Sequence, residues 1–279
     1  MSKIIQALVI CTPLLHGTSF AQNLDELRSA SDQQGKWTIS LSAVASNAAI
    51  KIIDSEVALP EELAESDIEV ILSDDLSVSS TVVSSSVGYR ILPLAEVFVR
   101  GGLIASDTET GVTITGTPNG PFSDVFDGPI TIDGEADMDL EGYSIGLGAN
   151  AILPILSFEN NTLAAYSSFQ FIRNEFDDAV SSEGAITSFG LIYPLNIEED
   201  KIIYRVGGSY NWITRNIEQS LLLNGESVRV SVTQEFKDPW AVEAGVGIPV
   251  ASNTLLGLGV WHQFSGETSA LVSLTYRFD

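Results

Sequence analysis

The histidine chemistry available to this sequence rests on one residue. His16 and His262 are the only histidines, and His16 lies in an N-terminal segment that we expect to be removed. The segment 261–265 places His262 three positions before Ser265. Because side chains alternate between the two faces of a strand, these two residues are predicted to face opposite sides. A nucleophile and its base must meet within hydrogen-bond distance, so a hydrolase is kept only as the alternative.

Paired carboxylates are a second candidate chemistry. Asp74-Asp75 and Asp177-Asp178 are adjacent acidic pairs of the kind that a protease with acidic residues at its rim would need. In a chain with 37 acidic residues, however, such pairs are expected from composition alone, and loop solvation is the favoured interpretation. The sequence has no metal-ligand spacing and no phosphate-binding glycine loop, so we expect no cofactor and no metal.

Six charged residues form the main candidate site. They share one parity of alternation with small polar neighbours, and each lies near an expected strand end: Arg90, Glu96, Arg100, Arg205, Glu243 and Arg277. In a narrow interior such charges must be paired or hydrated. Pairing predicts a salt-bridged plug, whereas hydration predicts a narrow passage that the excess of arginine would make anion-selective. Both alternatives stay open, with the plug favoured.

The elements that position these residues begin after a secretory signal. Lys3 provides a positive start, 4–15 is an apolar run, and 19–21 is a small-x-small cleavage site, so the mature chain is expected to begin at Gln22. Cys11 is the only cysteine and lies in the segment to be removed. A cysteine-free mature chain suits the oxidising periplasm.

Composition narrows the classes further. The 279 residues are 44% hydrophobic and 18% charged, and the net charge of −24 argues against nucleic acid as a partner. After residue 21, no apolar run reaches the roughly 18 residues that a spanning helix needs. If the chain crosses a membrane, it must therefore do so as a closed barrel.

Strict alternation supports that possibility. Apolar and small polar residues alternate in the segments 37–45, 81–91, 143–153, 202–212 and 270–278. This pattern is typical of strands with one lipid-facing and one lumen-facing side. Nine aromatic residues share the outward parity near strand ends and predict interfacial girdles: Trp37, Tyr89, Tyr143, Tyr193, Tyr204, Trp212, Trp240, Tyr276 and Phe278. The Gly-x-Gly sequences at 146–148 and 257–259 are expected to let inward positions pack closely.

Prolines divide the alternating segments into hairpins. Pro93, Pro154, Pro194 and Pro249 each close an alternating run before a short polar turn. With the C-terminal run they predict five hairpins, hence about ten strands with both ends on one side. The long connections are expected as outer loops at 54–76, 107–138 and 217–228, with a hairpin of its own within 111–134. Most acidic residues fall in 54–75, 107–139, 175–183 and 198–200, which we interpret as loops.

The last strand resembles the assembly signal of bacterial outer-membrane proteins. It alternates apolar residues and carries Leu274, Tyr276 and Phe278, although Asp279 follows the usual terminal aromatic. Together with the signal segment and the alternating strands, it makes the chain similar to the bacterial outer-membrane β-barrel superfamily, porin-like or small. The resemblance implies an all-β, antiparallel, transmembrane up-and-down barrel of about ten strands, within a range of roughly eight to twelve.

The resemblance also sets the expected organisation, location and partners. We expect a signal peptide at 1–21, a short periplasmic segment at 22–35 and an outer-membrane barrel at 36–279. The implied partners are outer-membrane lipid, lipopolysaccharide and the barrel-assembly machinery. The implied role is a non-enzymatic structural or surface-interaction barrel, or a narrow pore with a charged lumen. The alternative is an outer-membrane hydrolase that resembles lipid A deacylases, phospholipases or omptin-like proteases.

The first prediction concerns export. Protein isolated from outer membranes should begin at or near Gln22, because Ala21 closes the only good cleavage site in the N-terminal segment. N-terminal sequencing or intact mass measures this directly. Retention of Met1 in that fraction would contradict export through a cleaved signal.

Overall fold

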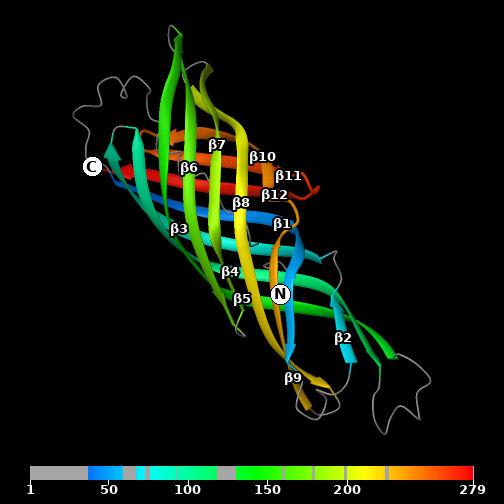
Figure 1. Cartoon of the computed structure of the whole chain (residues 1–279). Helices are drawn as coiled ribbons and strands as arrows, with labels where there is room; N and C mark the ends of the chain where they lie inside the picture. Colours follow the sequence, from blue (N-terminus) through cyan, green and yellow to red (C-terminus); the bar gives the residue numbers. More distant parts are fainter. Residues whose placement is uncertain are drawn as a thin grey trace, which may run out of the picture.

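The computed structural model describes residues 37–58, 67–72, 76–92, 94–117, 130–158, 161–177, 180–197, 200–223 and 226–278. These residues form twelve strands (Figure 1): β1 (Trp37–Ala58), β2 (Asp67–Leu72), β3 (Leu76–Leu92), β4 (Ala95–Thr117), β5 (Ile130–Phe158), β6 (Asn161–Phe176), β7 (Val180–Ile197), β8 (Asp200–Leu223), β9 (Glu226–Phe236), β10 (Trp240–Ala251), β11 (Thr254–Gln263) and β12 (Thr268–Phe278). Among the described residues, no helix is long and apolar enough to cross a membrane. The expected signal at 1–21, the segment 22–35, Asp74-Asp75, Pro93, Asp178 and Asp279 lie outside the described residues.

Ten of these strands close into a ring. Its order is β1, β3, β4, β5, β6, β7, β8, β10, β11 and β12, and β12 pairs with β1 to complete it. At this closure Trp37 lies opposite Phe278, and the ladder continues to Ala45 opposite Ala270. Every neighbouring pair is antiparallel. The predicted all-β, antiparallel up-and-down barrel with a ring of ten strands is thus confirmed.

The two-residue connections that follow the prolines lie at one end of the barrel, as predicted. The β5–β6 connection spans two residues after Phe158, and the β10–β11 connection spans two after Ala251. The β-ladders shift register directly beside Pro154 and Pro249, where the missing N–H interrupts hydrogen bonding. The first residue of β1 and the last of β12 lie at this same end, which we call the turn end.

The opposite end, called the outer end, corrects the loop assignments. The β4–β5 ladder runs on to Gly116 opposite Ile130, which confirms the hairpin expected within 111–134. The segment 217–228 is not a long loop, because β8 and β9 pair there as far as Leu223 opposite Glu226. Much of 54–76 and 107–138 is also strand. Acidic residues were interpreted as a sign of loops, but a solvent-exposed β-ribbon also accepts charged side chains without losing its backbone pairing.

The outward face of the ring is apolar. On β1, for example, Ile39 and Leu41 are exposed, whereas Ser40 and Ser42 are buried, so the predicted alternation is confirmed. None of the nine aromatic residues expected outside is buried. Trp37 and Tyr89 contact each other with ring centroids 4.8 Å apart at the turn end, and Tyr210 and Trp240 do so at 4.9 Å farther out.

The interior differs between its two halves. Towards the turn end, the buried inward residues are mostly serine, threonine and five of the six predicted charges. Towards the outer end, a cluster of buried apolar side chains lies in the lumen, including Ile50, Ile104, Phe176 and Trp261, beside buried polar residues such as Arg215. Alternation predicts small or polar residues at the inward positions, so the apolar cluster was not expected.

The second prediction concerns ring closure. Removing Phe278 and Asp279 should lower the amount of assembled barrel while secretion continues, because Phe278 ends the β12–β1 ladder opposite Trp37. Heat-modifiable gel mobility measures assembly, and cell fractionation measures secretion. Unchanged mobility in the truncated protein would show that closure does not depend on this residue.

Candidate functional site

The structure places all six predicted charges on the inner wall. Arg90, Glu96, Arg100, Glu243 and Arg277 are buried, and the side chain of Arg205 is 10% exposed. They come from β3, β4, β8, β10 and β12, and Arg90 lies directly opposite Glu96 in the β3–β4 ladder. The parity assignment is correct, while a functional role for the set stays a prediction.

Glu243 is the centre of one contact group, the Tyr166 cluster, made of Tyr166, Arg205 and Glu243. The Tyr166 hydroxyl donates a hydrogen bond to Glu243. Arg205 Nη2 lies 3.9 Å from Glu243 Oε2, and the Arg205 guanidinium lies 5.2 Å from the centre of the Tyr166 ring. Since β7 and β8 separate β6 from β10 in the ring, the Tyr166–Glu243 bond crosses the lumen.

Two glycines make room for this crossing. Gly190 and Gly207 lie opposite each other in the β7–β8 ladder. A Cβ atom on Gly190 would lie 2.8 Å from the Tyr166 ring, and one on Gly207 would lie 2.5 Å from its hydroxyl. The bare backbone at this pair therefore lets the Tyr166 side chain pass over β7 and β8 to reach β10.

Glu96 is the centre of a second group near the turn end. Its Oε1 accepts a hydrogen bond of 3.1 Å from the Thr38 hydroxyl. Gly88 leaves the space that Glu96 occupies, because a Cβ there would collide with the carboxylate. Thr38 is on β1 and Glu96 is on β4, so β3 lies between them.

Arg100 continues this group towards the lumen centre. Its Nη2 donates to Ser84 Oγ at 2.9 Å, and Ser84 in turn lies 2.9 Å from Ser42 Oγ. The Arg100 side chain lies over Gly146, since a Cβ at that glycine would be 3.2 Å from its Cγ. Phe98 lies over Gly148 in the same way, so close inward packing over 146–148 is confirmed.

Two inward residues with lumen contacts, Arg215 and Tyr166, are not among the six predicted charges or the other predicted sites. Arg215 is 2% exposed and donates from Nη1 to Thr108 Oγ1 at 2.9 Å across the lumen. Its guanidinium lies 5.5 Å from the Phe176 ring centre. The expected strand ended at 212, and continuing its alternation would have found Arg215. Tyr166 was missed because aromatic residues were assigned to the outward face, although it alternates in step with Ser168 and Gln170.

The catalytic alternatives gain no support from this geometry. His262 is exposed on the outward face, where its Nδ1 lies 2.9 Å from Thr268 Oγ1. Ser265 lies on the β11–β12 turn, and no contact between the two residues brings a nucleophile to a base. Asp177 is exposed at the end of β6. Within the described part of the chain, no three His, Cys, Asp or Glu residues gather as metal ligands.

Comparisons with known proteins extend only to the fold. No protein-family model matches the chain, and no curated protein matches its sequence. Among solved structures it is similar to the transport unit of the autotransporter AIDA-I from Escherichia coli, with 12% identity, a TM-score of 0.36 and coverage of 95% of this chain and 97% of that one. It is also similar to OprG from Pseudomonas aeruginosa, with 12% identity, a TM-score of 0.38 and coverage of 88% and 97%. The outer membrane protease OmpT from E. coli gives 12% identity, a TM-score of 0.45 and coverage of 89% and 98%.

The third prediction concerns the bond across the lumen. Tyr166→Phe should lower the free energy of unfolding by about 1–3 kcal/mol, because it removes the hydroxyl that donates to the buried Glu243 and leaves that carboxylate only Arg205, at 3.9 Å. Equilibrium unfolding of the barrel in lipid vesicles measures this difference. Tyr143→Phe is the matched control, since Tyr143 is 53% exposed on the outward face. Equal stability of the two variants would mean that the bond contributes nothing.

Proposed function

We propose that this chain is an outer-membrane β-barrel whose lumen is blocked by its own side chains, and that it serves a structural or surface-interaction role. The outward apolar face and the aromatic residues at its two levels support a membrane location. In this proposal the turn end faces the periplasm and the longer ribbons face outwards. The barrel-assembly machinery and the lipids of the outer membrane, lipopolysaccharide included, are its partners.

The packing of the lumen is the observation that carries the proposal. Every strand of the ring, together with β9, contributes at least one buried residue to the apolar cluster in the outer half. Two hydrogen bonds also cross the interior, from Tyr166 to Glu243 and from Arg215 to Thr108. A file of ions would need a continuous wet path, and tightly packed apolar side chains oppose one by dewetting.

The contacts of the inward charges support a plug over an open passage. Five inward arginines, the predicted four plus Arg215, face two inward glutamates, Glu96 and Glu243. Arg100 and Arg215 donate to serine and threonine hydroxyls, and Arg205 is shared between Glu243 and the Tyr166 ring. These hydrogen bonds hold the side chains in fixed positions inside the barrel. Any passage opened by mutation would retain the positive excess.

A surface role is supported by the shape of the outer end. The β4–β5 ribbon and the β8–β9 ribbon continue past the last residues of the β6–β7 ladder, and β2 widens the first of them by pairing with β4. These ribbons and their extension are visible beyond the ring in Figure 1. Paired strands hold such an extension in a fixed shape, because their backbone hydrogen bonds help to offset the entropic cost of ordering it.

The fourth prediction tests closure by electrical recording. The wild-type barrel should give no steady current in a planar bilayer, because packed side chains fill its lumen. Replacing both Tyr166 and Arg215 by alanine should produce currents that favour anions, since Arg90, Arg100, Arg205 and Arg277 remain inside.

A matched control separates lumen opening from loss of structure. The double variant Tyr143→Ala and Arg173→Ala removes the same residue types from exposed positions of β5 and β6, so it should stay silent. Steady wild-type currents would contradict the closed barrel and favour the narrow pore.

A further inference from the structure

The barrel wall is interrupted at one place near the outer end. One edge of β1 pairs with β12 from Trp37 to Ala45, and the same edge pairs with β9 from Ile50 onwards. Between the two ladders, the Lys237 amide donates to the Ala49 carbonyl at 2.9 Å. Over residues 46–49, the neighbour of β1 on this edge therefore changes from β12 to β9. The meander β10–β12 ends here, and the β8–β9 ribbon takes its place beside β1.

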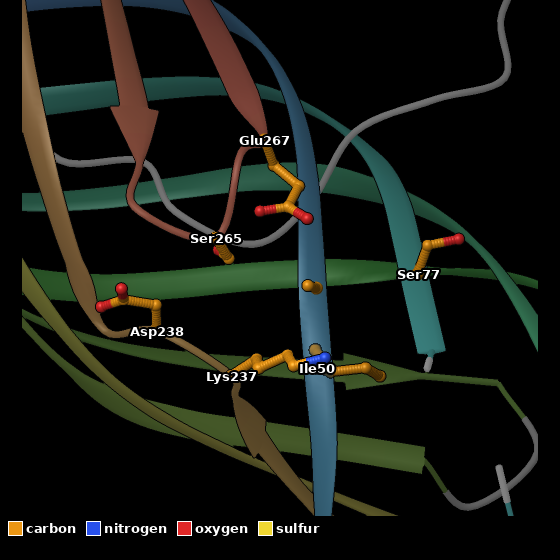
Figure 2. Close-up of a pocket in the computed structure, with 7 residues that line it drawn as sticks. Ile50, Ser77, Lys237, Asp238, Ser265 and Glu267 are labelled. Carbon is orange, nitrogen blue, oxygen red and sulfur yellow. The ribbon is translucent and has the colours of Figure 1, made fainter. Parts of the chain in front are cut away.

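A pocket of about 490 Å³ occupies this interruption. Its lining consists of Ala49, Ile50, Ser77, Lys237, Asp238, Ser265 and Glu267. Figure 2 shows Lys237 and Ile50 beside each other at β1, with Ser265 and Glu267 on the β11–β12 turn and Asp238 on the β9–β10 connection. Lys237 is exposed and Ile50 is buried in the lumen cluster, so the pocket lies in the thickness of the wall.

The pocket holds polar atoms that lack partners. Ser265 Oγ and Glu267 Oε2 are buried and make no hydrogen bond. Asp238 Oδ1 accepts a bond of 3.0 Å from the Trp240 amide, which fixes that carboxylate at the rim. A buried carboxylate oxygen without a donor costs free energy, and a ligand with hydroxyl or amine donors would remove that cost.

The charges of the pocket select the ligand class. One ammonium, from Lys237, stands against two carboxylates, from Asp238 and Glu267, so a bare phosphate would meet net repulsion. A sugar fits better, because its hydroxyls donate to Glu267 and Ser265 while its ring and hydroxyl oxygens accept from Lys237.

The position of the pocket selects the source of that sugar. Trp240 lies two positions after Asp238, and Phe264 lies one position before Ser265. Their side chains are 44% and 66% exposed, respectively, on the outward apolar face. Below them, Val242 and Val260 continue that face. A molecule with a sugar head and acyl chains would satisfy both regions at once.

We propose that this pocket binds the sugar head group of an outer-leaflet glycolipid, whose acyl chains lie along β10 and β11. Glu267 and Ser265 accept hydrogen bonds from its hydroxyl groups, and the Lys237 ammonium donates hydrogen bonds to its oxygens. The proposal rests on the outer-membrane location proposed above and adds a specific lipid site to it.

Native mass spectrometry of the full barrel in detergent tests the proposal, with dephosphorylated lipid A, whose sugar head group carries no phosphate, as the glycolipid probe. Wild type should retain one glycolipid per barrel. Glu267→Gln and Lys237→Ala should each weaken retention about tenfold, as expected for the loss of one charged hydrogen bond. Glu235→Gln is the matched control, because Glu235 lies on β9 outside the pocket lining and pairs with Lys51 at 3.9 Å; it should retain the probe like wild type.

Two further arms distinguish other occupants. Phosphatidylglycerol should not displace the glycolipid, and the free disaccharide head group without acyl chains should bind far more weakly. Equal retention by all variants, displacement by phosphatidylglycerol, or tight binding of the free sugar would each overturn the proposal. Heat-modifiable mobility and vesicle flotation are recorded for every variant. If the wild-type barrel assembles and floats with vesicles but retains no glycolipid, only this inference is refuted. If the wild-type protein does not float, the proposed membrane function is refuted as well.

Discussion

The structure depends on one constraint, the pairing of backbone N–H and C=O groups around a closed ring. Each strand of the ring satisfies both edges with its neighbours, and the β12–β1 ladder removes the last free edges. In lipid an unpaired edge would cost several kcal/mol for each polar group. The closure at Trp37 and Phe278 is therefore the contact on which the other ladders rely. It also explains the interruption of the wall near the outer end, because β1 is longer than β12 and needs β9 to cover the rest of its edge.

A ring of about ten strands leaves a lumen little wider than packed side chains, and this width dictates what the inward positions carry. Some large groups lie over glycines on other strands, as Tyr166 does over Gly190 and Gly207 and as Phe98 does over Gly148. The many inward serines and threonines do the complementary work, since they are small and supply hydroxyls to the arginines. A buried guanidinium needs acceptors, and Ser84 and Thr108 provide hydroxyls to Arg100 and Arg215, respectively, without adding negative charge.

The sequence predicted the ring better than it predicted the interior. Period-two alternation with prolines at the turns identified ten strands, their outward face and the six inward charges, because each of these properties is local to one strand. The apolar cluster and the bond from Arg215 to Thr108 join residues that are far apart in the chain. Their partners follow from the register and order of whole strands, which no single segment encodes. The length of the outer ribbons and the pairing of β8 with β9 were not predicted for another reason, since acidic residues there resemble a loop although the backbones pair.

The two halves of the lumen solve different problems. Near the turn end, charged and hydroxyl groups bind one another in fixed positions, so that half favours a single arrangement of its strands. Near the outer end, apolar packing fills the space where β9 replaces β12 beside β1 and where the wall is interrupted. A polar interior at that level would admit water through the interruption and hydrate the arginines below. The apolar cluster therefore isolates the polar half from the pocket, and this separation lets the wall carry a polar pocket without opening the barrel.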